Sequence, residues 1–393
     1  MSAGKSIALL LMLVACSLTF SLLLHDNLGF DARIINDYSD RGIYAEEGLW
    51  LARSKIPYTE SFSEYPQIAL YFFAVPHILV SLINPRGSLP LDYPTFFSLL
   101  MMVFSFVSIL TLRKLLDNDR KNLALLLLLP ASFYFTFNRF DIMPCCFTLQ
   151  SVYFFSKGQY KGSAVFLAVG VLTKWYLVLL LPIFLAYYFS VHKRIPWAML
   201  ITFGLTGLAI ILPTLLTGGI EGLVLPYKFH LTTEMNNESL LSLMDYGVRQ
   251  VLKVGFANSH TFSLFLLLQF VTIPFCLTSR VASLDKVIKW CALALLTFLL
   301  FAKFYSPQWI LWVSPFLILK ARKKADVLWL ILFDLLTYLY FPIGFDIFGE
   351  ASGAFMLLIA LKTIFLIGFI VPLVGELAKD NLVLAFFAER ISK

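Results

Sequence analysis

The sequence predicts an all-α membrane protein, a polytopic bundle of helices that crosses the bilayer several times. Hydrophobic residues make up 59% of the 393 residues and charged residues only 14%, and the mean hydropathy is +0.82. This composition lacks the polar side chains that cover a water-soluble protein. It also excludes a disordered chain, which needs low hydrophobicity and high charge. Because the apolar residues gather in blocks near bilayer length, we expect an integral, multi-pass membrane protein.

Each apolar block is expected to form one or two helices. Backbone groups in lipid must be hydrogen-bonded within the chain, and the blocks are too long and too uniformly apolar for barrel strands. Roughly 11–13 transmembrane or re-entrant helices are therefore predicted. The block 163–190 is long for one span, and we expect it to turn at Thr173-Lys174 into two half-length helices. The blocks lie at residues 6–24, 67–83, 93–112, 122–137, 140–156, 163–190, 196–217, 261–279, 286–302, 307–320, 326–343 and 352–374.

Two long connections interrupt the single membrane domain that we expect over residues 1–393. The first covers 25–66 and is strongly acidic at its start, and the second covers 218–260. Clusters of lysine and arginine mark the cytoplasmic side of a membrane protein. They occur at 157–161, 192–194 and 320–324. Both long loops are therefore expected outside the cytoplasm, where loops held by a rigid scaffold often carry function.

The basic clusters also explain the net charge of +7, so nucleic-acid binding is not expected. A further basic group contains Arg113, Lys114, Arg120 and Lys121. It has the composition of a cytoplasmic segment, although simple alternation of the spans from a cytoplasmic N-terminus places it outside. A re-entrant segment between residues 113 and 190 would reconcile the two observations.

A few charged residues lie where lipid is expected to surround them. They are Arg139, Asp141, Lys174, Lys303, Asp334 and Lys362. A charge at membrane depth is costly and is therefore usually paired or functional. Internal partners, or a lysine that reaches the membrane surface, are the alternative, and we favour it for Asp334 and Lys362. The acidic first loop and the other cations predict a carboxylate that acts as general base and cations that bind an anionic group such as a phosphate.

Five segments follow one another in an order that is known from one enzyme class. They are Asp37–Tyr44 with Pro57-Tyr58 and Tyr65-Pro66, Asn138-Arg139-Phe140-Asp141 after Leu129-Pro130, Thr173-Lys174-Trp175-Tyr176 before Leu181-Pro182, Tyr227-Lys228-Phe229-His230, and Lys303 to Trp309. Together they cover about residues 31–316, and they resemble GT-C glycosyltransferases that use polyprenyl-phosphate sugars. The resemblance is greatest to the GPI mannosyltransferase I type and to related α-mannosyltransferases.

The resemblance implies a helical bundle of the GT-C type and a hexosyltransferase, with mannose as the expected sugar. Such an enzyme moves the sugar from a polyprenyl- or dolichyl-phosphate donor to a lipid-linked or glycan acceptor on the extracytoplasmic side, and a single displacement inverts the anomeric centre. Asp40 is the expected general base and Asp37 a second acidic residue. The donor phosphate is expected to bind Arg139, Lys174, Lys303 and His230. The substrates are expected to contact Tyr44, Tyr58, Tyr65, Asp141, Tyr227, Gln308 and Trp309.

The spacing of Asp37 and Asp40 is wider than the Asp-x-Asp of some relatives. We therefore predict no metal site and no required cofactor, with a divalent cation as the alternative. Glu46 and Glu47 are expected to be solvated positions on a helix rather than catalytic residues. The expected partners are the lipid-linked donor, the acceptor and membrane lipids. The expected location is the plasma membrane of a prokaryote or the endoplasmic reticulum membrane of a eukaryote, and the oligomeric state stays open.

A second function class is a transporter or flippase for lipid-linked sugars or other anions. Charged residues within the membrane suit this class, because alternating access would use them as well. Transporters are commonly built from two related halves. The long acidic first loop and the lack of a convincing internal repeat favour the enzyme.

Overall fold

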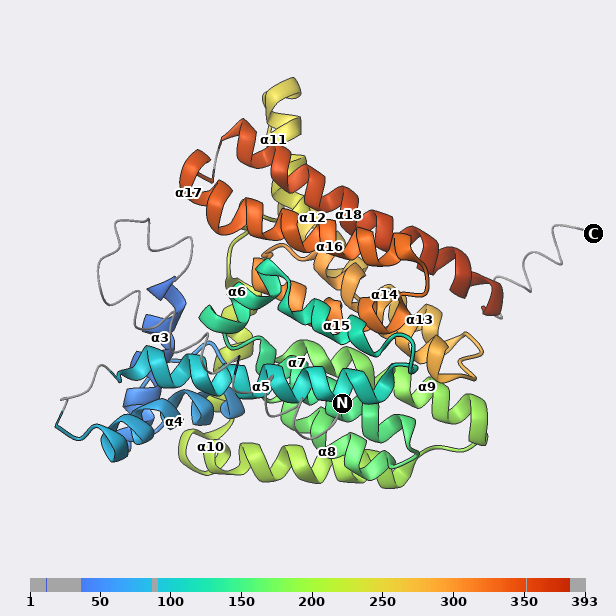
Figure 1. Ribbon diagram of the computed structural model, residues 1–393. Helices are drawn as coiled ribbons and strands as arrows, with labels where there is room; N and C mark the ends of the chain where they lie inside the picture. Colours follow the sequence, from blue (N-terminus) through green and yellow to red (C-terminus); the bar gives the residue numbers. More distant parts are fainter. Residues whose placement is uncertain (1–11, 13–36, 87–90, 351, 382–393) are drawn as a thin grey trace, which may run out of the picture. The chain divides into compact units, whose positions relative to one another are not determined.

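The computed structural model describes residues 12, 37–86, 91–350 and 352–381 (Figure 1). Every regular element in that part of the chain is a helix, which confirms the predicted all-α class. The expected span at residues 6–24 and the beginning of the first long loop lie outside the described residues.

Six helices within the described residues are long and apolar enough to cross a membrane, which indicates a multi-pass membrane protein. They are Tyr93–Leu115, Trp175–His192, Trp197–Thr232, Ser259–Leu277, Lys324–Phe348 and Gly353–Asp380. The sequence predicts more spanning or re-entrant segments, and the difference arises because several apolar blocks form shorter helices. The block 122–137, for example, forms η1 (Lys121–Leu128) and α6 (Pro130–Asn138), and proline at the start of α6 suits such a break.

The described chain forms two compact units, and the first comprises the described residues within 1–128, 132–177 and 198–232. Its helices are α3 (Tyr38–Ala52), α4 (Gln67–Ile83), α5 (Tyr93–Leu115), η1, most of α6, α7 (Ile142–Ser156), α8 (Tyr160–Val171), the start of η2 (Trp175–Leu179) and α10 (Trp197–Thr232). In this unit α3 packs against α4, α4 against α5, and both α5 and α8 against α7. The residues of the candidate site that come from the first loop belong to this unit.

The second unit comprises residues 129–131, 178–197 and 233–393. Its helices are α9 (Leu180–His192), α11 (Leu240–Leu252), α12 (Ser259–Gln269), α13 (Thr272–Leu277), α14 (Leu284–Phe301), η3 (Pro307–Trp309), α15 (Ile310–Lys320), α16 (Lys324–Tyr338), η4 (Leu339–Gly344), α17 (Phe345–Phe348), α18 (Gly353–Leu377) and η5 (Ala378–Asp380). α14 packs against α15 and α18. Every residue of α14 from Trp290 to Leu300 is buried, as expected for a helix that is apolar on all sides.

The structure confirms that the block 163–190 forms two helices. α8 stops before Thr173-Lys174, and η2 starts after it. The carbonyl oxygen of Leu172, at the end of α8, accepts a hydrogen bond of 2.9 Å from the backbone N–H of Ile68 on α4. The last carbonyl groups of a helix have no partner inside it, so this bond from α4 stabilises the break that holds Lys174.

The expected second long loop, 218–260, contains much helix. α10 continues through its beginning with a kink at Gly219, and α11 follows later. Gly219 has φ +63°, a backbone conformation that favours glycine because it has no Cβ atom. The kink separates the apolar part of α10 from a second segment that carries Tyr227 and His230.

α3 and α4 approach each other closely at Gly48. A Cβ atom at this position would lie 2.1 Å from the carbonyl oxygen of Phe73 on α4. This distance is far inside van der Waals contact, so only glycine permits the packing. Asp40, Tyr44 and Gly48 are spaced four residues apart, which places them on one face of α3. The close approach therefore fixes the helix face that carries Asp40.

Gly48→Ala is expected to destabilise the protein by about 1–3 kcal/mol, because the added methyl group would force α3 away from the backbone of α4. The matched control is Gly42→Ala on the same helix, where a Cβ atom would meet nothing within 4 Å. The higher helix propensity of alanine should there raise stability by up to about 1 kcal/mol. Thermal unfolding of both purified variants in detergent measures the difference. Equal melting temperatures would contradict the close packing at Gly48.

Candidate active site

The N-terminus of α3 carries the first acidic residues of the site. Asp37 is the N-cap, and its Oδ1 accepts hydrogen bonds from the backbone N–H of Ser39 at 3.0 Å and from the Ser39 hydroxyl at 2.7 Å. A capping oxygen satisfies a backbone donor that has no partner within the helix. Asp40 follows in the first turn, and the Tyr44 hydroxyl, one turn later, donates to Asp40 Oδ2 at 3.3 Å. Asp37 therefore sets the start of the helix that positions Asp40.

Asn138 and Arg139, at the junction of α6 and α7, hold these acidic residues. Asn138 Oδ1 accepts a hydrogen bond of 2.9 Å from the backbone N–H of Asp37. Arg139 Nη2 lies 2.5 Å from Asp37 Oδ2, and Arg139 Nε lies 2.8 Å from Asp40 Oδ2. The planar guanidinium presents several donors in a fixed geometry, which suits it to bridging two carboxylates.

Asp40 is the accessible member of this cluster. The side chains of Asp37 and Arg139 are each 4% exposed, whereas that of Asp40 is 29% exposed. Burial raises the pKa of Asp37, but the charge of Arg139 and the hydrogen bonds from Ser39 outweigh burial and hold that pKa below its ordinary value. Both contacts of Asp40 use Oδ2, and Oδ1 has no hydrogen bond to the described part of the chain. Asp37 is thus ionised and fixed, while Asp40 keeps one oxygen available.

A second ion pair joins Asp141 to Lys174. Lys174 Nζ lies 2.7 Å from Asp141 Oδ1; the Asp141 side chain is fully buried and that of Lys174 is 14% exposed. Lys174 lies in the turn between α8 and η2, and Asp141 directly precedes α7. Lys174 Nζ also lies 4.6 Å from the centroid of the Phe140 ring, a cation–π contact. The break in the block 163–190 therefore brings a cation to the segment that carries Arg139.

Phe140 connects the two ion pairs. Its ring meets those of Tyr44, Tyr65 and Phe73 edge-on, with centroids 5.3, 5.2 and 5.2 Å away. Edge-to-face contacts of this kind are favourable between aromatic rings. Because Phe140 stands between the arginine and the aspartate of its segment, this packing fixes both charged side chains relative to α3 and α4.

Glu64 is a residue of this site that the sequence pattern did not single out. Burial raises the pKa of its carboxyl, and the hydrogen bond with Tyr65 and the charge of Lys174 only partly offset this increase. The charge of Asp40 raises the same pKa further, so the three charged groups act on one another. The carbonyl oxygen of Glu64 lies 3.1 Å from His230 Nε2 on α10. The position of Glu64 directly before the Tyr-Pro pair is the signal that would have identified it.

The tyrosines predicted to bind substrate are found largely inside the protein. Tyr58 is buried, has φ +63°, and donates from its hydroxyl to the carbonyl oxygen of Tyr65 at 2.6 Å. A positive φ is uncommon for a bulky residue and persists only when the surroundings enforce it. Tyr44 and Tyr65 are also buried, and Tyr227 on α10 is half-buried. These side chains hold the first loop in shape, and their contact with a substrate stays a prediction.

Lys303, Gln308 and Trp309 belong to the second unit. The segment is attached to Asn236, whose side chain donates to the carbonyl oxygen of Tyr305 at 2.5 Å and accepts from its N–H at 2.9 Å. Burial lowers the pKa of Lys303 below its ordinary value. Gln308 is buried, and the Trp309 ring stacks on a neighbouring tryptophan with centroids 4.5 Å apart. Their contacts with the donor stay predictions.

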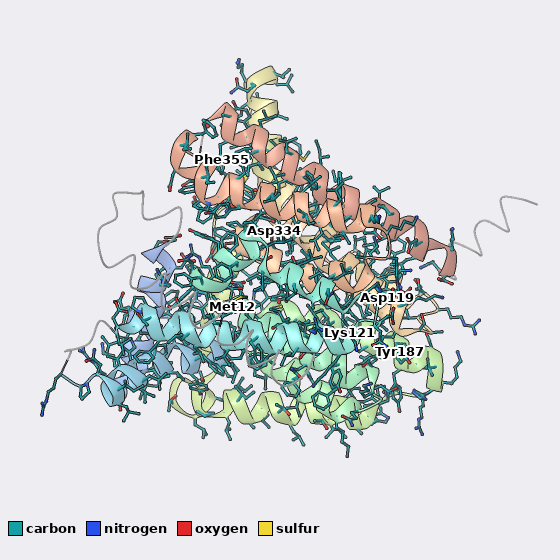
Figure 2. All side chains as sticks on the ribbon, viewed as in Figure 1. Met12, Asp119, Lys121, Tyr187, Asp334 and Phe355 are labelled. Atoms are coloured by element: carbon teal, nitrogen blue, oxygen red, sulfur yellow. The ribbon has the colours of Figure 1, made fainter. Side chains whose placement is uncertain are left out.

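Asp334 and Lys362 have internal partners in the second unit, as predicted. Asp334 lies on α16 and is labelled in Figure 2. Its Oδ1 accepts a hydrogen bond of 2.8 Å from the backbone N–H of Ala131. This bond satisfies a donor at the N-terminus of α6 that has no partner within the helix. Lys362 Nζ donates to the carbonyl oxygen of Glu238 and lies 3.5 Å from the centroid of the Tyr305 ring.

Within the described residues no group of three or more histidine, cysteine, aspartate or glutamate side chains is placed to hold an ion. Asp37 and Asp40, the two aspartates that the sequence predicts for the site, share the guanidinium of Arg139. The prediction that no cofactor is required is therefore still a prediction.

Comparisons with known proteins give no family for this chain. No family model matches the sequence, and no curated protein matches it.

Glu47, on α3, is buried, so the expectation of a solvated position is wrong. The residue is 6% exposed, and its Oε2 accepts a hydrogen bond of 2.8 Å from the Ser63 hydroxyl. Burial raises the pKa of Glu47 to about 8, because it outweighs the hydrogen bond from Ser63. Glu46, its neighbour in the chain, is exposed as expected. Glu47 is therefore mostly protonated at neutral pH.

Glu47→Gln is expected to make the protein less sensitive to pH. Below the ordinary glutamate pKa of 4.5, the folded and unfolded chains both hold the proton of Glu47. As the pH rises to about 8, only the unfolded chain releases it, so the stability of the wild type falls over this window. Glutamine cannot ionise, so the melting temperature of Glu47→Gln should fall less between pH 5 and 8.

Thermal unfolding across this range measures the effect. Glu46→Gln is the matched control and should follow the wild type. Identical pH profiles for Glu47→Gln and wild type would refute the burial of a protonated carboxyl.

Proposed function

We propose that the chain is a GT-C-type glycosyltransferase of the membrane. It moves a hexose, with mannose as the expected sugar, from a polyprenyl- or dolichyl-phosphate donor to a lipid-linked or glycan acceptor outside the cytoplasm. The observation that carries this proposal is the state of Asp40. One of its oxygens is held by Arg139 and Tyr44, and the other has no hydrogen bond to the described residues. A general base needs such a fixed but accessible carboxylate.

In the proposed reaction, Asp40 Oδ1 takes the proton of an acceptor hydroxyl as the hydroxyl oxygen bonds to the anomeric carbon. The bond between the anomeric carbon and the phosphate oxygen breaks, and the lipid phosphate leaves with the electron pair. A single displacement of this kind inverts the anomeric centre. A retaining mechanism would instead need a second carboxylate as nucleophile. Asp37 is unsuited to that role, because it is buried and already binds Arg139 and Ser39.

The lipid phosphate leaves as an anion, so nearby positive charge assists its departure more than a proton donor does. Preorganised cations at the position where charge develops stabilise a transition state strongly. Lys174 is the cation that we propose to contact the phosphate, because Asp141 orients it and its side chain is partly exposed. Arg139 is buried between two carboxylates and is better suited to holding Asp40. Lys303 and His230 remain proposed contacts of the phosphate.

A transfer assay tests the proposal against the transporter alternative. The purified chain is reconstituted in liposomes with polyprenyl-phosphate mannose that is radiolabelled in the sugar, together with a crude lipid extract as acceptor. Label in a new lipid or glycan, with inverted linkage, supports the enzyme. Label that moves across the vesicle membrane with no new bond supports a transporter or flippase and contradicts the proposed function.

A further inference from the structure

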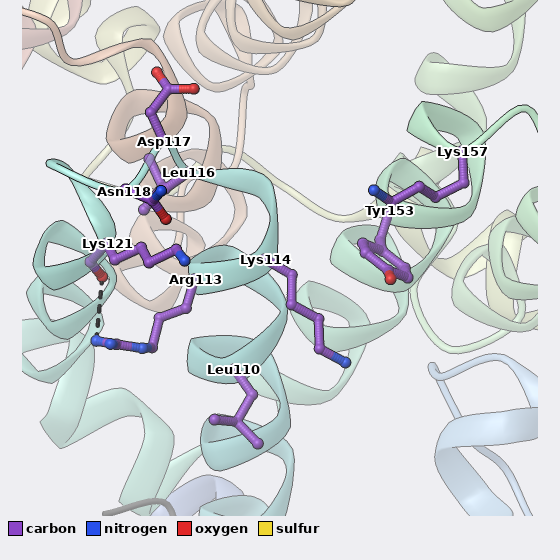
Figure 3. A pocket seen from close by; sticks show the side chains of 9 residues that line it. All are labelled: Leu110, Arg113, Lys114, Leu116, Asp117, Asn118, Lys121, Tyr153 and Lys157. Carbon is purple, nitrogen blue, oxygen red and sulfur yellow. Dashed lines mark hydrogen bonds between the residues drawn. The ribbon is translucent and has the colours of Figure 1, made fainter. Parts of the chain in front are cut away.

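The first unit contains a cavity of about 750 Å³ that shares no residue with the candidate active site (Figure 3). It lies where α5 and α7 end and η1 begins. Four cationic side chains line it, namely Arg113, Lys114, Lys121 and Lys157. Three of them, Arg113, Lys114 and Lys121, belong to the basic group for which composition and the alternation of spans predict opposite sides of the membrane.

The described residues supply no ion-pair partner for the cations of this cavity. None of the four cations forms an ion pair with a described residue, and Asp117, an acidic residue of the lining, pairs with Arg120 at 2.6 Å. Lys114 and Lys157 both lie over the ring of Tyr153, with Nζ atoms 5.5 and 5.7 Å from its centroid. The ring attracts each ammonium group, but it supplies no negative charge that would neutralise them.

Helix dipoles explain only part of this arrangement. Arg113 and Lys114 lie in the last turn of α5, and Lys157 follows the end of α7, where a helix dipole favours a cation. Lys121 instead opens η1, where the exposed backbone N–H groups disfavour a positive charge. The carbonyl oxygen of Lys121 accepts a hydrogen bond of 3.4 Å from the Arg113 guanidinium, which connects the end of α5 to the start of η1 (Figure 3). The helix dipole therefore does not explain why a cation stands at position 121. An anion bound in the cavity would explain it.

The lining also changes from apolar to charged along α5. Leu110 lies one turn before Arg113 and Lys114 on the same helix face, and all three line the cavity. Because α5 is long and apolar enough to span a membrane, this order places Leu110 toward the apolar part of the helix and the cations at its end. A ligand with an apolar part beside its negative charge would match this order. A lipid has both parts, with acyl chains next to its phosphate, and basic pockets between membrane helices bind anionic headgroups.

We propose that this cavity binds the headgroup phosphate of an anionic membrane lipid. Arg113, Lys114, Lys121 and Lys157 contact the phosphate, and Leu110 contacts the first part of an acyl chain. The site is independent of the proposed glycosyl transfer, because it uses none of the residues of that reaction.

Titration of the detergent-solubilised full chain with lipid tests the proposal. Short-chain phosphatidylglycerol is expected to raise the melting temperature, whereas short-chain phosphatidylcholine and inorganic phosphate leave it unchanged.

The variant Lys114→Gln/Lys121→Gln/Lys157→Gln is expected to bind phosphatidylglycerol at least tenfold more weakly. The control is Lys161→Gln/Lys193→Gln/Lys324→Gln, which removes the same charge from exposed positions outside the cavity and should bind as the wild type does. The single variant Lys121→Gln, expected to bind several-fold more weakly, replaces the triple variant if that one does not fold.

Three results would overturn the proposal. Equal stabilisation by phosphatidylglycerol and phosphatidylcholine would show that the phosphate charge is not recognised. Equal stabilisation by inorganic phosphate would make this a site for free anions rather than lipid. Equal weakening of binding in the pocket and control variants would show that only the overall charge of the protein attracts the lipid.

Discussion

Asp40→Asn is expected to lower sugar transfer by about 10²–10⁴-fold while the protein stays folded. Asparagine has the same shape and keeps an oxygen for the contacts with Arg139 and Tyr44, but it cannot accept the proton of the acceptor hydroxyl. Because Asp40 is 29% exposed and Arg139 retains Asp37, the substitution leaves no buried charge without a partner. Initial transfer rates with the radiolabelled donor measure the loss, and the melting temperature of the same sample measures the fold.

The control for Asp40→Asn is Glu46→Gln, which removes an acidic charge from an exposed position on the same helix. It should transfer sugar at the rate of the wild type. Asp37→Asn provides a second comparison, because the N-cap of α3 and a buried ion pair are both weakened, so its first effect should be on stability. If Asp40→Asn kept more than a tenth of the wild-type rate, another group would have to be the base.

The helices of this fold could largely be predicted from apolar length, but their breaks could be predicted only in part. The turn at Thr173-Lys174 was predictable because the block 163–190 is too long for one span and holds a lysine near its centre. The stability of that turn depends on Ile68, whose N–H bonds to the end of α8 across about 100 residues of sequence. The continuation of α10 past Gly219 was not predicted either, since the same residues are compatible with a loop or with a kinked helix.

The candidate site divides in a similar way. The sequence identified Arg139, Asp141 and Lys174, because a charge within an apolar block requires a partner or a function. It could not assign the partners, since Asp37 and Arg139 are separated by 102 positions and meet only through the packing of α3 on its neighbours. Glu47 shows the same limit on a smaller scale. Glu46 and Glu47 are neighbours on α3, and the helix directs only the side chain of Glu47 toward the interior.

Arg139→Met is expected to destabilise the protein by about 3–5 kcal/mol, the usual loss when one partner of a buried ion pair is removed. Methionine fills much of the same volume but leaves the carboxylates of Asp37 and Asp40 without a cation. Water cannot replace it at Asp37, which is 4% exposed. The matched control is Arg249→Met, because Arg249 pairs with Asp245 but is 61% exposed. Asp245 is itself buried but keeps hydrogen bonds from the backbone N–H groups of Phe256 and Ala257, so loss of the solvated arginine should change stability by no more than about 1 kcal/mol. Thermal or denaturant unfolding in detergent measures both.

A double variant separates two effects of Arg139→Met. One is the loss of the cation that pairs with buried Asp37, and the other is the loss of side-chain packing. Asp37→Asn alone should destabilise the protein, because it weakens the N-cap and the ion pair. In the Arg139→Met background the same change removes a buried charge that has no partner, so Asp37→Asn/Arg139→Met should be more stable than Arg139→Met. The coupling energy of this double-mutant cycle is expected to exceed about 1 kcal/mol, as for residues in direct contact. Strict additivity would contradict a stabilising ion pair between Asp37 and Arg139.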